Sequence, residues 1–413
     1  MIFGYRTTCL FLVSTLYASV PAFRVVVPIQ ENHVLRPISQ GLFNSLEELS
    51  RVVDVSYCVG STGLQKPFEC LSHCSDLGGF ELLATWNTGP FFSDSCGYIA
   101  LSHSPSLERI IVAFRGTYSI TNTIIDLSVY PQSYVPYQTD DGRGGDEIPR
   151  CLNCTVHAGF MTSWQNTRSI VLDRVSAARE QNPNYQLVLV GHSLGGAVAT
   201  LAGVEMQLRG WEPTVTTFGE PKVGNRGFAD FLGKIFGISD LAENLPAEER
   251  RLRKITHIHD PVPLLPLEEW GYAMHGGEIF ISKEELPLSV HDVHLCEGAT
   301  DSRCISGSEG AQLLETVLHG TTSLVMNARP QGARAHSPKQ QILSNDHPSK
   351  LSLVSEKESV NVDADAEPQG LHNLPWDLVP SRYRLWELFF SHRDYFWRLG
   401  LCVPGGDPTG MGG

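Results

Sequence analysis

One short stretch of the sequence combines a nucleophilic residue with backbone that would expose it. Ser193 lies in Gly191-His-Ser-Leu-Gly195, which fits the pattern G-x-S-x-G. The apolar run 187–190 before it predicts a buried strand, and residues 197–202 after it predict a helix. A serine on such a turn sits in strained backbone with its hydroxyl directed into a cleft, and the flanking glycines let strand and helix approach closely. We therefore interpret Ser193 as a nucleophile and the N–H of Leu194 as an oxyanion donor.

A serine hydroxyl needs a base to take its proton, and the base needs an acid that orients it. On a turn of this kind, the partners follow in the order serine, acid, histidine. Asp260 comes directly after a predicted strand over residues 255–258 and is the preferred acid. Glu220 and Asp230 are weaker alternatives.

The base has to be chosen among eight histidines that follow the acid. Four of them fall in or beside a polar segment and are set aside: His319, His336, His347 and His372. His275 precedes two glycines, which favours a structural contact. His392 lies in an aromatic segment near the end of the chain, where the expected order places the base, and it is preferred. His291 and His294, just before Cys296, remain as alternatives.

A second oxyanion donor is expected from a loop that follows an earlier strand. Thr117 ends Phe114-Arg-Gly-Thr117, directly after a predicted strand over residues 109–115, and offers a backbone N–H and a hydroxyl. Residues 118–126 then carry a short apolar face. This segment is compatible with a hinged lid and with a static surface helix.

The elements that must position these groups alternate along the chain. Apolar or alternating runs predict strands over 97–103, 109–115, 187–190, 214–218, 255–258 and 278–281, and apolar faces predict helices over 40–58 and 159–180. The first helix would carry the acidic residues of Ser45-Leu-Glu-Glu in its first turn. Strands that alternate with helices predict an α/β fold, a mostly parallel, doubly wound sheet with helices on both faces.

Composition and charge narrow the class of protein. The chain has 413 residues and a formal net charge of −14, which argues against a nucleic-acid partner. Residues 1–22 combine Arg6, a short apolar stretch and small residues, which predicts a secretory signal peptide; a buried N-terminal helix is the alternative. No other apolar run approaches the ~20 residues that span a bilayer. We expect a secreted, extracellular protein without a transmembrane segment.

The remaining sequence divides into one domain and several peripheral segments. Residues 40–305 and 375–404 are predicted to form a single domain, interrupted by residues 306–374, whose polar composition predicts a disordered insertion. Residues 23–39 are compatible with a propeptide and with a loose arm. Residues 405–413 are predicted to be a flexible tail.

Ten cysteines in an exported chain predict disulfides. Cys9 should leave with the signal peptide, and Cys96 is left over as a buried thiol. The close pairs are Cys70/Cys74, Cys151/Cys154 and Cys296/Cys304, while Cys58 and Cys402 lie near the two ends of the mature chain. Zinc at Cys151-x-x-Cys154 is disfavoured because no second pair has suitable spacing. Asn153-Cys-Thr155 is the sole glycosylation sequon, and its position inside a tight loop argues against its occupancy.

These motifs together resemble the class 3 lipases of filamentous fungi. The resemblance covers about residues 42–304 and 380–402 and rests on Tyr57-Cys58, Phe114-Arg-Gly-Thr117, Cys151-x-x-Cys154-x-x-His157-x-Gly-Phe160, Gly191-His-Ser-Leu-Gly-Gly196, Phe218-Gly-Glu-Pro-Lys-Val-Gly-Asn225, Thr256-His-x-x-Asp260-x-Val-Pro263 and His392-x-x-Tyr-Phe396.

The resemblance implies an α/β-hydrolase fold with a triad of Ser193, Asp260 and His392. It places the oxyanion hole at Thr117 and Leu194 and a lid at residues 118–126. It also implies disulfides that join Cys58–Cys402, Cys70–Cys74, Cys151–Cys154 and Cys296–Cys304, and no metal or cofactor.

The expected activity is that of a carboxylester hydrolase, most simply a monomeric triacylglycerol lipase acting on acylglycerol at a lipid–water interface. The candidate lid lacks the tryptophan that lids of this family often carry. A feruloyl-type esterase acting on plant cell-wall esters is therefore the alternative enzyme. A secreted lipid-binding protein without catalysis is the alternative outside enzymes.

Overall fold

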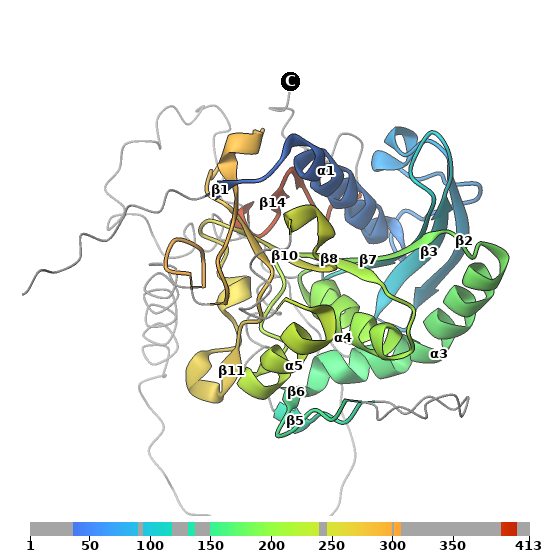
Figure 1. Ribbon diagram of the computed structural model, residues 1–413. Helices are drawn as coiled ribbons and strands as arrows, with labels where there is room; N and C mark the ends of the chain where they lie inside the picture. The colour runs from blue at the N-terminus through green and yellow to red at the C-terminus, as the bar shows by residue number, and fades with distance from the viewer. Residues whose placement is uncertain are drawn as a thin grey trace, which may run out of the picture. The chain divides into compact units, whose positions relative to one another are not determined.

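The computed structural model describes residues 36–89, 94–117, 131–136, 149–238, 246–299, 301–306 and 390–402 (Figure 1). The predicted signal peptide, the lid at residues 118–126, nearly all of the insertion and the tail at residues 405–413 lie outside these residues. No helix among the described residues is long and apolar enough to cross a membrane.

A nine-stranded sheet forms the centre of the described chain (Figure 1). Its spatial order is β1 (Arg36–Pro37), β13 (Val293–Leu295), β12 (Glu278–Ile281), β10 (Leu252–His257), β8 (Thr214–Phe218), β7 (Gln186–His192), β4 (Arg109–Phe114), β3 (Cys96–Ser102) and β2 (Phe80–Asn87). The five strands from β12 to β4 are parallel, and antiparallel strands are added at both edges. The predicted fold class is confirmed.

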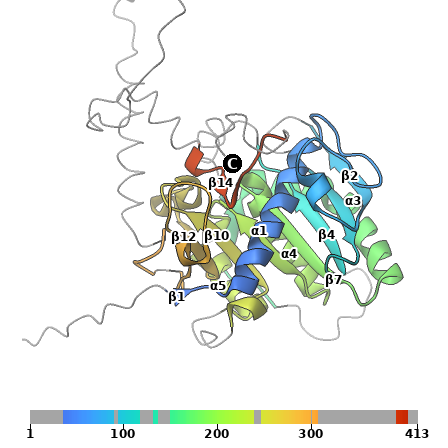
Figure 2. The ribbon, with the colours of Figure 1, turned by 90° about the horizontal axis from the view of Figure 1, so that it is seen from above.

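Helices cover both faces of this sheet, because the parallel strands are apolar on both sides. On β4, Ile110 and Val112 face the cluster that contains α3 (Ala158–Gln181), α4 (Leu194–Leu208) and α5 (Arg226–Phe236). Ile111 and Ala113 face the opposite cluster, which contains α1 (Gln40–Val55). Figure 2 shows α1 lying across the strands on this second face. Strands buried on both sides explain the continuous apolar runs in the sequence.

The first helix begins before the acidic residues that the sequence analysis placed in its first turn. Ser39 caps it by accepting the N–H of Leu42 at 3.1 Å, and its first turn holds no acidic residue. The acidic pair lies farther along the helix, where Glu48 binds the buried guanidinium of Arg109 at 2.6 Å. The position of this first turn was therefore wrong, because the capping signal at Ser39 was overlooked.

The last described segment, residues 390–402, packs beside α1 (Figure 1). It folds into a hairpin of β14 (Asp394–Tyr395) and β15 (Trp397–Arg398). The indole N–H of Trp397 donates to Glu47 on α1 at 3.0 Å, and the N–H of Gly400 donates to buried Asp54 at 2.7 Å. A smaller sheet, in the order β11 (Tyr272–Ala273), β9 (Gly224–Asn225), β6 (Thr155–His157) and β5 (Pro131–Ser133), completes the described strands.

Candidate active site

The turn between β7 and α4 holds Ser193 in unusual backbone. Its φ is 56° and its ψ is −131°, a region that few residues other than glycine adopt. A Cβ built on Gly191 would lie 2.2 Å from the carbonyl oxygen of Gly195, and one on Gly195 would lie 2.4 Å from that of Phe114. Only glycine therefore permits this close approach of strand and helix. The N–H of Ser193 donates to Phe218 at 2.9 Å, which ties the turn to the end of β8.

Asp260 and His392 form a buried pair. Nδ1 of His392 lies 2.9 Å from Oδ2 and 3.0 Å from Oδ1 of Asp260, and both side chains are at most 1% exposed. The carboxylate also accepts the N–H of Val262 at 2.9 Å and the hydroxyl of Tyr395. Burial raises the pKa of Tyr395 well above its usual range, so this hydroxyl stays protonated and donates. These bonds hold Nδ1–H of the imidazole toward the acid and leave Nε2 as the basic nitrogen.

The imidazole lies at the same end of the sheet as the serine. A Cβ built on Gly219 would stand 2.9 Å from Cε1 of His392 and 3.0 Å from Oδ2 of Asp260. Gly219 directly follows Phe218, the residue that binds the backbone of Ser193. Oγ of Ser193 and Nε2 of His392 are both buried and form no hydrogen bond, with each other or with any other described atom. Loose catalytic contacts of this kind are common without substrate.

A second hydrogen-bond network, formed by Tyr57 and His192, contacts the backbone of His392. The hydroxyl of Tyr57 donates to Nδ1 of His192 at 2.6 Å, and Nε2–H of His192 donates to the backbone oxygen of His392 at 2.8 Å. The two imidazole rings lie 4.6 Å apart, centre to centre. Burial, with a smaller contribution from nearby His392, lowers the pKa of His192 well below its usual value. His192 is therefore neutral. Because the backbone oxygen of His392 can only accept, the ring proton lies on Nε2, and Nδ1 accepts the hydroxyl of Tyr57.

The sequence analysis missed the roles of Tyr57, His192 and Tyr395, although all three stand within the motifs that carry the family resemblance. Each role depends on a contact between residues at least 135 positions apart. No local sequence pattern indicates such a contact.

The loop after β4 passes against the nucleophile. A Cβ built on Gly116 would lie 2.5 Å from the hydroxyl of Tyr57 and 2.9 Å from Cβ of Ser193. Thr117, the next residue, is half-buried, and Leu194 is the buried first residue of α4. Thr117 therefore directly follows Gly116, which lies against Ser193, and Leu194 directly follows Ser193 itself.

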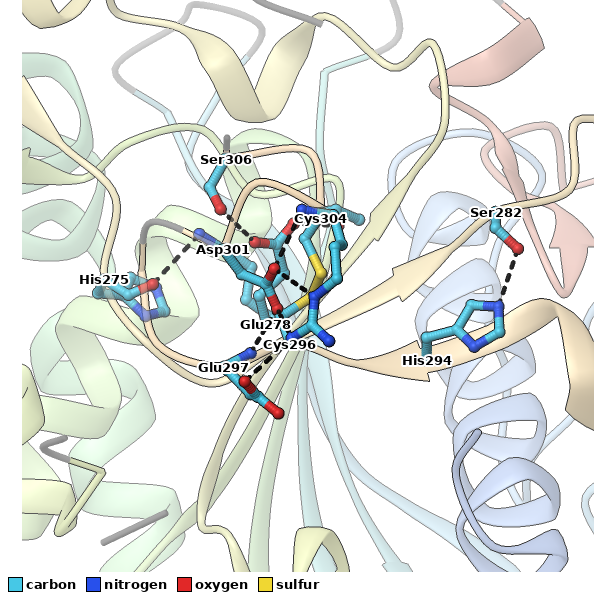
Figure 3. Close-up of a disulfide and its surroundings, with 12 residues drawn as sticks. His275, Glu278, Ser282, His294, Cys296, Glu297, Asp301, Cys304 and Ser306 are labelled. Atoms are coloured by element: carbon cyan, nitrogen blue, oxygen red, sulfur yellow. Dashed lines mark hydrogen bonds and ion pairs between the residues drawn. A yellow bond between two sulfur atoms is a disulfide. The ribbon is translucent and has the colours of Figure 1, made fainter. Parts of the chain in front are cut away.

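The alternative histidines lie elsewhere. His294 is on β13, where its Nε2 lies 3.0 Å from Oγ of Ser282 (Figure 3), and His291 is exposed. Strands β12, β10 and β8 separate β13 from β7, which leads to Ser193.

The alternative acids have other surroundings. Glu220 is buried among Thr200, Thr217 and His275, with its Oε1 2.8 Å from the hydroxyl of Thr200. Asp230 is exposed on α5. Of the three carboxylates, Asp260 is the one that the described contacts join to His392.

The four predicted disulfides are present, joining Cys58–Cys402, Cys70–Cys74, Cys151–Cys154 and Cys296–Cys304, and Cys96 is a buried free thiol. Glu278 lies beside the last of these pairs, as Figure 3 shows. The spacing of these three residues would suit a metal ion, but both sulfurs are joined in the disulfide. The carboxylate binds Thr256 at 2.6 Å and Ser306 at 2.9 Å. This cluster is a structural feature at the edge of the sheet.

A serine on a strand-to-helix turn, with a buried Asp–His pair at the same end of a parallel sheet, defines an α/β-hydrolase. A family model described as lipase (class 3) matches residues 111–270. Lipase A of Sodiomyces alcalophilus is 47% identical over 416 residues, 96% of this chain and 90% of that protein. Secreted mono- and diacylglycerol lipase 2 of Gibberella zeae is 47% identical over 393 residues, 91% of this chain and 85% of that protein.

Among solved structures, Lip2 lipase from Yarrowia lipolytica matches with a TM-score of 0.59 at 32% identity, over 68% of this chain and 93% of that one. The chain belongs to the class 3 lipase family, and it is a carboxylic ester hydrolase.

Proposed function

We propose that this protein is a secreted lipase that hydrolyses acylglycerols through an acyl-enzyme on Ser193. One observation carries the assignment of the site: the buried Asp260–His392 pair lies against Gly219, next to the residue that holds the backbone of Ser193. The names of the two relatives support the substrate class, since one is called a lipase and the other a secreted mono- and diacylglycerol lipase.

In the proposed mechanism, each group has one role. Nε2 of His392 takes the proton of the Ser193 hydroxyl as Oγ attacks the ester carbonyl. Asp260 stabilises the imidazolium that forms and keeps Nδ1–H directed toward itself. The N–H groups of Thr117 and Leu194 stabilise the oxyanion, a contribution worth ~10²–10³ in rate for each donor. His392 then protonates the leaving glycerol oxygen, and water attacks the acyl-enzyme by the same route to release the fatty acid.

His192 and Tyr57 support this cycle without touching the substrate. The base becomes a cation in each half of the reaction, so a second cation 4.6 Å from its ring would oppose that step. Buried His192 remains neutral and holds the backbone of His392 in place. We also propose that the enzyme acts as a monomer at the lipid–water interface.

The nucleophile is tested by Ser193→Ala, with Ser163→Ala as the matched control. Ser163 is equally buried on α3, where it donates to the backbone of Asp94. Loss of a serine nucleophile costs on the order of 10⁴–10⁶ in turnover. We expect that loss on tributyrin and triolein emulsions, with no labelling by an organophosphonate, while the control keeps both. Full turnover by Ser193→Ala would overturn the mechanism.

The substrate class is tested by comparing esters. Tributyrin is assayed below and above its solubility limit, beside methyl ferulate in solution. A lipase is expected to gain rate once the emulsion forms and to leave the ferulate ester largely intact. Rapid turnover of methyl ferulate without any gain at the interface would assign the site to the feruloyl-type esterase instead.

A further inference from the structure

The tripeptide Asn153-Cys154-Thr155 is not used by the hydrolytic site. It is the only Asn-x-Ser/Thr sequence in the chain with x other than proline. Asn153 is exposed at the tip of the loop that the Cys151–Cys154 disulfide closes, with a φ of 56°. Its side-chain amide forms no hydrogen bond with the described residues. An amide in this position is free to carry a substituent.

The loop is held from beneath through its backbone. Nδ2 of Asn225 donates to the backbone oxygen of Asn153 at 2.8 Å, and Oδ1 of Asn225 accepts the N–H of Thr155 at 3.1 Å. A Cβ built on Gly227 would lie 3.1 Å from the backbone oxygen of Leu152. Because α5 contacts the backbone, the side chains at the tip are left to point outward, and a group attached to Asn153 would not disturb this packing.

Two apolar residues lie near Asn153 in the fold. Leu152 precedes it in sequence, and Val135 follows Tyr134, whose N–H donates to the backbone oxygen of Cys154 at 2.8 Å. Leu152 and Val135 are each 75% exposed, more than any other large hydrophobic residue in the described part of the chain. The C–H face of a pyranose ring covers apolar side chains of this kind, so a sugar on Asn153 would remove both from water.

We propose that Asn153 carries an N-linked oligosaccharide that covers Leu152 and Val135. Nδ2 of the asparagine forms a C–N bond to C1 of a lipid-linked oligosaccharide diphosphate, the C1–O bond to phosphate breaks, and the amide loses one proton as the lipid diphosphate leaves. The transfer precedes closure of the Cys151–Cys154 loop, because the closed loop holds the tripeptide in a tight turn that a transferase cannot bind in extended form.

The modification is tested on full-length protein secreted from a yeast or filamentous-fungal host. We expect the intact mass to exceed that of the chain by one N-linked glycan in most molecules, and peptide-N-glycosidase F, which hydrolyses the glycosylated amide, to leave aspartate at position 153. Asn153→Gln and Thr155→Ala should both lose the added mass. Cys151→Ser, which removes the disulfide and keeps the tripeptide, should be modified at least as fully as the wild type. Asn153 that is unmodified in most molecules of the wild-type protein would overturn the proposal.

A separate measurement tests whether the glycan covers Leu152 and Val135. Removal of the glycan from the folded protein should increase the binding of a hydrophobic dye severalfold. The double variant Leu152→Ser/Val135→Ser, glycosylated at the same site, should show no such increase. Equal dye binding before and after deglycosylation of the wild type would show that the glycan does not cover these side chains. Lipase activity remains unchanged in both tests, because none of these residues contacts Ser193, Asp260 or His392.

Discussion

Gly219 provides the sharpest test of how the base is positioned. In Gly219→Ala, the new Cβ would stand 2.9 Å from Cε1 of His392 and 3.0 Å from Oδ2 of Asp260, closer than real Cβ contacts allow. The φ at this position is +57°, so alanine also adds backbone strain of about 1–2 kcal/mol. The carboxylate is also held by Val262 and Tyr395, whereas the described contacts of the ring are with Asp260, so the imidazole is the group that moves. Loss of general-base catalysis costs about 10²–10⁴ in kcat.

The matched control is Gly237→Ala, at the end of α5. Gly237 has a φ of +67°, and no heavy atom of the described residues lies within 4 Å of the position its Cβ would take, so this variant tests the strain without the collision. Activity is measured on tributyrin with active sites titrated by an organophosphonate, and stability by urea unfolding. We expect Gly219→Ala to lose kcat at nearly unchanged KM and to lose at least as much stability as Gly237→Ala, whose kcat stays close to that of the wild type. A kcat for Gly219→Ala within threefold of wild type, or an equal loss in Gly237→Ala, would refute the reasoning.

Three further predictions follow from burial and connectivity. Burial lowers the pKa of His157 to about 4, so a contribution to stability that is complete above pH 6.5 is lost as the pH falls toward 4. The loss amounts to about 3 kcal/mol at pH 4, and His157→Gln should flatten the pH dependence of the free energy of unfolding, measured with urea, over this range. The Cys58–Cys402 bridge spans 344 positions, for which loop-closure entropy gives about 6 kcal/mol as an upper value; Cys58→Ser/Cys402→Ser should lower the Tm, and an unchanged Tm would contradict this estimate. Tyr57→Phe removes the donor to His192 and should lower kcat up to about tenfold at constant KM, unlike a purely structural loss, which would lower only the Tm.

The fold was largely predictable because its centre is buried on both faces. Strands such as β8 (Thr214–Phe218) and β12 (Glu278–Ile281) match their predicted bounds, since continuous β-branched and apolar runs are typical of parallel strands. The edge strand β2 (Phe80–Asn87) was missed. Its alternation is interrupted by a register shift between Leu82 and Ala84, and it is only partly buried. An edge strand with a bulge leaves no regular period to detect.

The candidate site was predictable where a local motif carries the chemistry. The turn at Ser193 is such a motif, and Asp260 follows a recognisable strand. The choice of His392 depended on chain order and composition, and the structure joins that residue to Asp260. The supporting bonds from His192 and Tyr395 join residues 200 and 135 positions apart, and such contacts are created by the fold alone.

Both edges of the large sheet are built so that a further strand cannot add to them easily. Strand β1 is two residues long and ends at Pro37, which has no N–H to offer to a neighbouring chain. At the other edge, the irregularity between Leu82 and Ala84 breaks the row of hydrogen-bonding groups on β2. A second molecule would therefore find no straight template at either edge of the sheet as described. These two edges disfavour edge-to-edge aggregation through strand pairing even where the enzyme is concentrated.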